Sequence, residues 1–337
     1  MIDFRYHLVS IIAIFLALAV GLVVGATTLT GPTETALNKA EHDLSQANAG
    51  LRARNAALNQ QLGADQAFAQ AGSDRLLAGL LTGQKVVLVV PPGTDGTLIS
   101  DVTASLQQAG ASVTGKVMLQ PSFFDFSAPT EASLTTAAKG LAAQAGVKLD
   151  SPANQAVAGQ QAAAQVIAAS IVAKDLLTGG LPAGTSKAIQ NQFGGYLQIS
   201  PTGASLGTAN LAVLFTPSSA GSSTAQATVM SQALSAVANA LAAASHGTVL
   251  AGSLGAITPN TPSAILTEGS SGPASTVDNA DTPSGSIMVA QALARLLQGK
   301  APGAYGVEPG TAPSPAPTPS VTPTPGTSTT ASKGKSK

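Results

Sequence analysis

The sequence predicts an α/β protein that is attached to a membrane by one N-terminal helix. Three observations predict this: an uncharged stretch at 8–26, a leucine repeat behind it, and alternating strand-like and helix-like segments from residue 85. We expect five regions along the chain. They are a cytoplasmic head at 1–7, a transmembrane helix at 8–29, a coiled-coil stalk at 33–81, an α/β domain at 85–306 and a disordered tail at 307–337.

The composition narrows the classes of function. Lys+Arg and Asp+Glu are equal at 16 each, so the chain lacks the excess positive charge on which nucleic-acid binding relies. We therefore expect no nucleic-acid partner. The absence of cysteine excludes disulfides and thiolate metal sites, and three histidines leave few groups for catalysis. No HExxH motif occurs, and we expect neither catalytic residues nor enzymatic activity.

The first predicted element, residues 8–26, reads LVSIIAIFLALAVGLVVGA. It carries no charge, and at about 1.5 Å per residue a helix of this length spans roughly the hydrocarbon core of a bilayer. A cleaved signal peptide is the alternative, because Val24-Gly25-Ala26 offers small or aliphatic residues for a peptidase. The long apolar run and the lack of a positive cluster before it favour a retained anchor. Its head is then cytoplasmic, and the bulk of the chain lies outside, in the cell envelope.

Small residues recur at every fourth position within this anchor and therefore share one helical face. Gly21 and Gly25 form a GxxxG pair, which lets two helix backbones approach closely. This pattern predicts an anchor that dimerises. The alternative is that alanine and glycine are simply common in transmembrane helices.

A leucine repeat follows a hinge that we predict at Thr27–Thr33, where the pair Gly31-Pro32 occurs. The repeat has the seven-residue spacing of coiled-coil d positions and consists of Leu37, Leu44, Leu51 and Leu58. The a positions are then Glu41, Asn48, Asn55 and Leu62. A buried Asn at an a position lowers stability but fixes a parallel register. We expect pairing with a second copy or with a partner protein; the alternative is a single amphipathic helix that docks on its own domain.

The segments after residue 85 predict a doubly wound, mostly parallel sheet of the Rossmann or flavodoxin kind. Strands are expected at 86–90, 112–119, 196–200, 211–216 and 248–251. Helices are expected at 98–108, 131–145, 160–177, 186–192, 223–245 and 286–298. The loop from Pro91 to Gly96 has neither GxGxxG nor a P-loop lysine, so it predicts a turn with Asp95 or Thr97 near the helix N-cap. We expect no bound cofactor there.

Asp278 and Asp281, which precede the last predicted helix, are weak candidates for a metal or substrate site. Ligands of open α/β sheets gather at loops that leave the strands, and carboxylates coordinate cations. The alternative is a structural turn in which Thr282 or Ser284 caps the helix and Pro283 lies in its first turn. From residue 307 onward the chain is rich in Pro, Thr and Ser, which predicts a disordered tail.

Two segments resemble a known family. The head MIDFRYHLVS, which runs into FLALAVG at 15–21, and the segment TVDNADTPSG at 276–285 with Tyr305-Gly306 behind it, are similar to the actinobacterial MctB proteins. These are described as copper-transport outer-membrane proteins. The resemblance covers nearly everything except the tail. It implies a role in copper efflux or tolerance at the cell envelope, and members of the family have also been linked to septal cell-wall assembly.

The residues themselves offer few copper ligands. Copper(I) prefers thiolate and thioether sulfur, and imidazole also serves, but the chain has no Cys, four Met and three scattered His. One helix alone cannot line a pore, so transport would need an oligomer. Two hypotheses follow: an anchored envelope protein of copper transport and homeostasis, or a non-catalytic coiled-coil scaffold that partners with septal or cell-wall assembly machinery.

Overall fold

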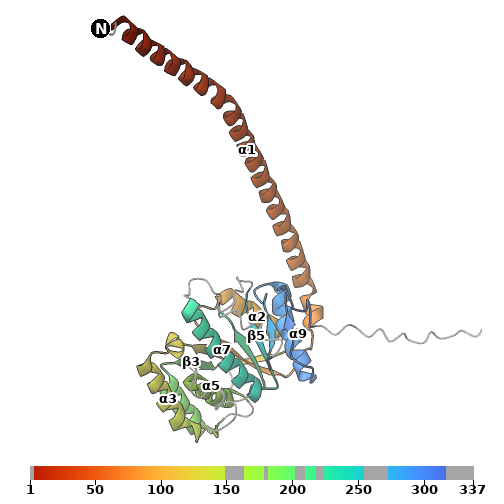
Figure 1. The fold of residues 1–337 in the computed structure, drawn as a ribbon. Coiled ribbons are helices and arrows are strands. Elements are labelled where there is room, and N and C mark those ends of the chain that lie inside the picture. Colours follow the sequence, from red (N-terminus) through yellow and green to blue (C-terminus); the bar gives the residue numbers. More distant parts are fainter. Residues whose placement is uncertain are drawn as a thin grey trace, which may run out of the picture. The chain divides into compact units, whose positions relative to one another are not determined.

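The computed structural model describes residues 4–148, 163–177, 181–201, 209–217, 224–253 and 272–315. The chain divides into two compact units, Met1–Asp65 and Gln66–Lys337. The first consists of most of helix α1, and the second contains the end of that helix and the α/β fold (Figure 1).

Helix α1 (Phe4–Leu77) contains the predicted anchor and the leucine repeat in one element. The hinge that we predicted at Thr27–Thr33 is wrong, because the backbone of these residues is helical. Pro32 has no N–H group and cannot donate to the carbonyl group of Thr28, so the helix continues with one backbone bond fewer. The alanine-rich and leucine-rich residues on both sides have high helix propensity and favour this continuation.

A seven-stranded sheet forms the centre of the second unit, in the order β3-β2-β1-β4-β5-β6-β7. The strands are β1 (Lys85–Val90), β2 (Ser112–Leu119), β3 (Leu197–Pro201), β4 (Leu211–Phe215), β5 (Gly247–Ala251), β6 (Ser275–Val277) and β7 (Ala304–Tyr305). All neighbours pair in parallel except β2 and β3, which are antiparallel. The predicted mixed α/β class with a mostly parallel sheet is therefore confirmed.

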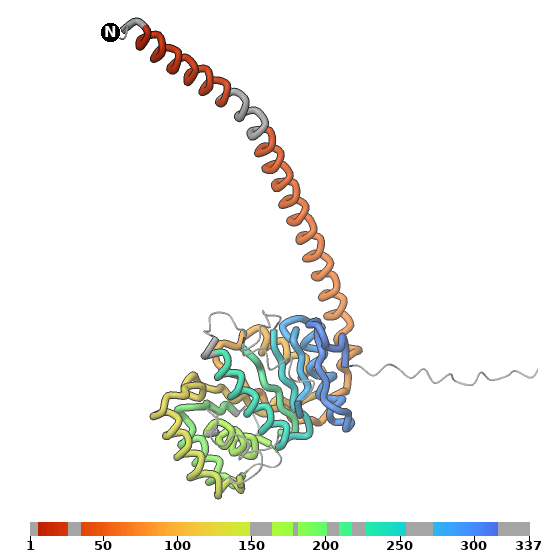
Figure 2. The backbone as a smooth tube through the Cα atoms, viewed as in Figure 1, coloured from red at the N-terminus to blue at the C-terminus, as the bar shows by residue number. Residues whose placement is uncertain are grey.

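Helices cover both faces of this sheet (Figure 2). One face packs against α5 (Ala163–Leu176) and α7 (Thr224–Ala244), and the same core includes residues of η1 (Pro121–Phe124), α3 (Ala128–Ala142) and α6 (Ala183–Phe193). The other face packs against α2 (Gly96–Gln108) and α9 (Pro283–Leu297). Strand β1 is apolar throughout because both of its faces are buried. Val87 and Val89 face the first core, whereas Val86 and Leu88 face the second.

Side chains cap the two helices of the second core as the sequence predicts. Asp95 is the N-cap of α2 and accepts a hydrogen bond from the N–H group of Thr97 at 2.7 Å. Thr282 is the N-cap of α9 and accepts one from the N–H group of Gly285 at 3.1 Å, with Pro283 in the first turn. Both caps confirm the local prediction.

The end of the domain lies further along the chain than we predicted. The tail was expected from residue 307, but the segment 307–315 is described and bonded to the sheet. The N–H group of Gly306 donates to the carbonyl oxygen of Ala312, and the N–H group of Ala312 donates to that of Ala304 at 2.8 Å. The prediction is therefore wrong for 307–315, because tertiary hydrogen bonds hold a composition that has little apolar surface. Residues 316–337 lie outside the described residues.

Candidate functional site

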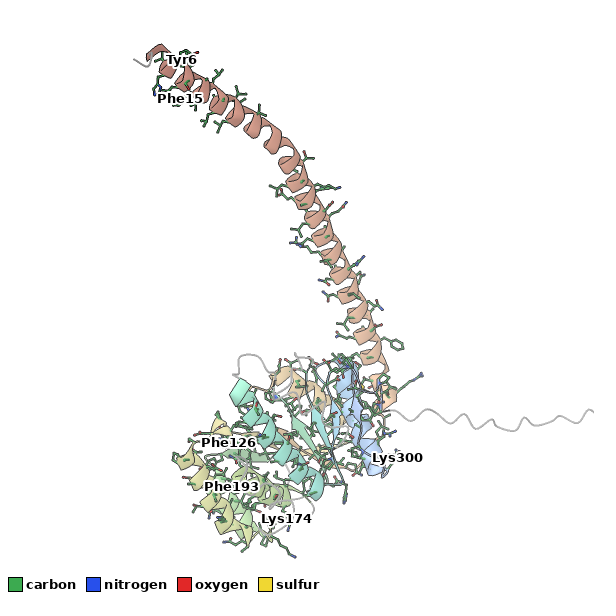
Figure 3. The ribbon with its side chains drawn as sticks, in the orientation of Figure 1. Tyr6, Phe15, Phe126, Lys174, Phe193 and Lys300 are labelled. Atoms are coloured by element: carbon green, nitrogen blue, oxygen red, sulfur yellow. The ribbon has the colours of Figure 1, made fainter. Side chains whose placement is uncertain are left out.

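The longest apolar surface on the described chain belongs to the first part of α1. Two described helical segments are long and apolar enough to cross a membrane, Tyr6–Gly25 and Ala227–Ala244. The second lies in α7 and packs against α5 and the sheet, which explains its apolarity. None of Tyr6–Gly25 is buried, and Figure 3 shows Tyr6 and Phe15 pointing away from the helix. This uncovered length of apolar side chains fits a lipid surrounding.

The face of this segment that carries the glycines contacts no other part of the described chain at Gly21 and Gly25. A methyl group added at Gly21 or Gly25 would meet no atom within 4 Å. A helix backbone can therefore approach both positions closely. The structure holds one copy of the chain, and the assignment of Gly21 and Gly25 to dimerisation stays a prediction.

The leucine repeat lies on the surface of α1. Leu37, Leu44, Leu51 and Leu58 are 68%, 70%, 60% and 61% exposed, and Leu62 is 53% exposed. Exposed leucines at a seven-residue spacing are costly unless another helix covers them, because each buried leucine contributes roughly 1.5–3 kcal/mol. The repeat is therefore a candidate interface for a second helix.

Asp278 serves the structure of the loop in which the sequence suggested a metal site. Its side chain is 1% exposed, and its two carboxylate oxygens accept hydrogen bonds from the N–H groups of Val307 at 2.9 Å and Glu308 at 3.0 Å. Gly306 has a φ of 141°, and a Cβ there would overlap the Asp278 carboxylate. Asp281 lies at the surface, in the turn before α9. Among the described residues no group of three or more His, Cys, Asp or Glu could hold a metal ion.

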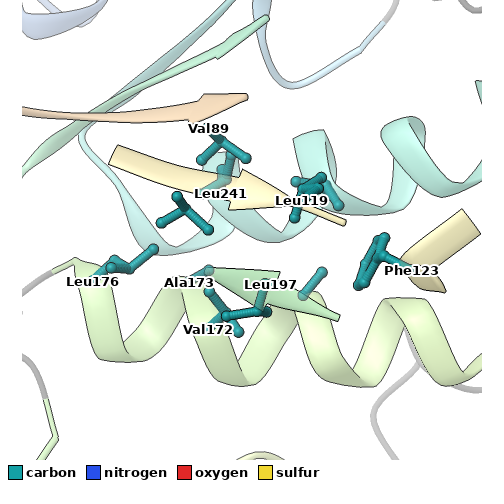
Figure 4. Close-up of a pocket in the computed structure, with 11 residues that line it drawn as sticks. Val89, Leu119, Phe123, Val172, Ala173, Leu176, Leu197 and Leu241 are labelled. Carbon is teal, nitrogen blue, oxygen red and sulfur yellow. The ribbon is translucent and has the colours of Figure 1, made fainter. Parts of the chain in front are cut away.

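A small apolar cavity lies between the sheet and helices α5 and α7 (Figure 4). Val89 and Leu119 line it from the strands, Phe123 lines it from η1, and Val172 and Leu241 line it from the helices. The described residues that line it are all apolar, and none of them offers a group to fix a metal or a polar substrate. We assign it to core packing.

A polar groove lies between the end of α1, α2 and the start of α9. The Ser105 hydroxyl donates to the Ser286 hydroxyl at 2.9 Å, and Ser286 donates to the carbonyl oxygen of Pro283 at 3.1 Å. Gln108 donates to the Ser73 hydroxyl at 3.1 Å. These polar groups satisfy one another and connect the three helices. The expectation of no catalytic residue stays a prediction, since a GxSxG run at 203–207 lies outside the described residues.

Sequence reasoning missed the buried carboxyl group of Asp175 in helix α5. The side chain is 0% exposed and accepts a hydrogen bond from the Ser186 hydroxyl, while its Oδ2 atom has no partner among the described residues. Burial raises the pKa of Asp175 above 3.8, and the bonds from Ser186 and the Leu181 backbone lower it by less. A lone aspartate in an apolar, alanine-rich helix is the signal that could have identified it.

We expect Asp175→Asn to flatten the pH dependence of stability. The folded state binds the Asp175 proton more tightly than the unfolded chain, so this group lowers the free energy of unfolding as pH rises above 3.8 through its folded pKa. The asparagine variant cannot titrate at this position. Its free energy of unfolding, relative to that of the native protein, should therefore be higher at pH 7 than at pH 4. Thermal melts of both proteins at several pH values measure this difference. Parallel pH curves for the two proteins would contradict it.

The chain is similar to known proteins over nearly its whole length. Residues 1–316 match the family model described as copper transport outer membrane protein, MctB. The copper transporter MctB of Mycobacterium tuberculosis (strain H37Rv) is 29% identical over 325 residues, which cover 91% of this chain and 96% of that protein. The copper transporter MctB of Mycobacterium leprae is 29% identical over 330 residues, with the same coverage.

Proposed function

Because this chain belongs to the MctB family, we propose that it is a membrane-anchored protein of the cell envelope that takes part in copper transport. The observation that carries this proposal is the match to the copper-transport family over residues 1–316, which includes the apolar segment Tyr6–Gly25. The segment supplies the attachment to lipid, and the α/β unit is the part that it tethers.

The proposed orientation places the N-terminus in the cytoplasm and the α/β unit outside. Arg5 is the one basic residue before the span, whereas Glu34, Lys39, Glu41 and Asp43 follow it. Short flanks with more positive charge stay on the cytoplasmic side, and here the bias is small. One uncovered apolar segment in the described chain supports a single pass.

Transport by this chain requires more than one copy or a partner. One helix cannot enclose a path for an ion, and the described residues bring no three His, Cys, Asp or Glu side chains together within one copy. Gly21 and Gly25 in the anchor support close pairing of two copies, and the exposed leucines of α1 support contact with a partner helix. We therefore propose that copper is handled by an assembly, with the cargo ion held between chains.

The exposed leucines of α1 favour a second candidate function. In this alternative the protein is a non-catalytic scaffold whose α1 helix recruits septal or cell-wall assembly machinery. Four leucines that are 60% exposed or more offer a surface for a partner that copper chemistry does not require. The absence of a three-ligand cluster among the described residues agrees with a scaffold equally well.

Deletion of the gene tests the two functions against each other. Loss of copper export is expected to raise cellular copper at least about two-fold under copper stress, because the export route is gone. The measurement is elemental analysis of washed cells, with the full chain supplied in trans as the control. Unchanged copper together with chained or misshapen cells would reject transport and favour the scaffold.

A further inference from the structure

Helix α1 carries charged side chains among and beside its exposed leucines. We name as the leucine seam the a and d positions Leu37, Glu41, Leu44, Asn48, Leu51, Asn55, Leu58 and Leu62. We propose that this seam takes a helix of a different protein, with a basic side chain opposite Glu41 and acidic side chains opposite Arg52 and Arg54. The inference rests on the proposed membrane attachment and names the kind of partner that the attached protein binds.

A second copy of this chain fits the seam poorly at Glu41. Two copies that are anchored in one membrane with the same orientation run parallel, and each a position then faces itself. Glu41 would face Glu41 of the other copy, and like charges in contact are unfavourable. The nearest cation in sequence, Lys39, stands at an f position on the far side of the helix. A basic side chain on a different helix removes this repulsion.

The flanks of the seam lead to the same conclusion. Arg52 stands at an e position and Arg54 at a g position, on the two sides of Leu51 and Asn55. In a parallel pair a g residue faces the e residue five positions further on, so Arg54 would face Asn59. The e and g positions of the seam carry no acidic residue: they are Asn38, Ala40, Ser45, Ala47, Arg52, Arg54, Asn59 and Gln61. A self-pair would therefore gather four guanidinium groups without a counter-charge.

The anchor leaves the seam free for such a partner. At about 100° per residue, Gly21 and Leu37 point about 160° apart on one continuous helix. Copies that meet through Gly21 and Gly25 inside the membrane therefore turn their leucine seams away from each other. Self-pairing through the anchor and partner binding through the seam are compatible, because they use different faces.

Cysteine cross-linking of full-length chains tests the preference. The natural chain has no cysteine, so a single Leu44→Cys reports only contacts at the seam. Two tagged chains with this change are reconstituted in one set of lipid vesicles. One has native charges, and the other carries Glu41→Lys, Ala47→Glu and Asn59→Glu, which place a basic side chain opposite Glu41 and acidic side chains opposite Arg52 and Arg54. We expect mixed disulfide dimers to exceed native-charge dimers at least ten-fold. The matched control is Ala53→Cys at an f position, which should cross-link little in any combination.

Two results would overturn the inference. One is native-charge dimers that form as readily as mixed dimers, and the other is no cross-link at Leu44→Cys in any combination. The same vesicles show whether the chains stay in lipid without detergent. If the chains stay in lipid but form native-charge and mixed dimers equally, only the partner inference is overturned. If the chains do not stay in lipid, the membrane attachment is overturned as well.

Discussion

Gly285→Ala is expected to destabilise the α/β unit strongly. A Cβ at residue 285 would lie 1.8 Å from the carbonyl oxygen of Asn279 and 2.8 Å from the Cα atom of Ala280. These are backbone atoms that cannot swing aside, because the N–H group of Ala280 donates to Gly252 at 2.7 Å and the Asn279 carbonyl oxygen accepts from Thr282 at 3.0 Å. We expect a loss of at least about 3 kcal/mol in the free energy of unfolding.

The same substitution at Gly96 is the matched control. Gly96 opens helix α2 as Gly285 lies in the first turn of α9, but a Cβ there meets no atom within 4 Å. Gly96→Ala should therefore unfold within about 0.5 kcal/mol of the native protein. Chemical denaturation followed by circular dichroism measures both variants. Equal midpoints for Gly285→Ala and Gly96→Ala would show that the turn before α9 is looser than the structure indicates.

Leu16→Arg combined with Val20→Arg is expected to release the chain from the membrane. Both side chains lie in the middle of the apolar segment, at 66% and 56% exposure. An arginine at the centre of a membrane helix costs about 2.5–3.5 kcal/mol on the insertion scale, and two arginines add to a penalty that one short apolar helix does not offset. Most of the variant should leave the membrane pellet. Ultracentrifugation of cell extracts followed by immunoblotting measures the distribution.

Gln46→Arg combined with Ala53→Arg provides the control for that experiment. These positions lie in the same helix but beyond the apolar segment, at the f positions that face away from the leucine seam. The charge change is the same, and the chain should stay in the membrane pellet. Release of both double variants would mean that added charge, and not loss of lipid contact, moves the protein.

The regular elements were predictable because their signals are local. The β-branched run of β1 predicts a strand buried on both faces, and the caps Asp95 and Thr282 follow from residue type and spacing alone. Strands β6 and β7 were missed, because three and two residues are too short for any periodic pattern. Their pairing depends on neighbours that are distant in the sequence.

Long-range hydrogen bonds explain the remaining errors. Whether Asp278 is a ligand or part of a structural turn was open in the sequence, and the N–H groups that occupy it come from about 30 residues further along the chain. The same two bonds carry residues 307 and 308 into the domain, against their tail-like composition. Gly31-Pro32 shows the opposite case, in which a strong local signal for a hinge was outweighed by helix-forming neighbours.

The candidate interface on α1 was visible in the sequence, but its occupant was not. The spacing of Leu37 to Leu58 predicts the surface, and the structure shows these leucines exposed on a continuous helix. Which helix covers them depends on charges outside the repeat, such as Arg52 and Arg54, and those become informative only when positions are assigned on the helix.

Intact-mass analysis of the native chain tests the central claim most directly, because every function proposed here requires a retained N-terminal helix. The protein is extracted from purified membranes, with the detergent-free soluble fraction analysed beside it. We expect the chain to be recovered only with detergent and its mass to include Tyr6–Gly25. A soluble chain that begins at Thr27 would show that the helix is removed, and it would contradict both the copper-transport and the scaffold proposal.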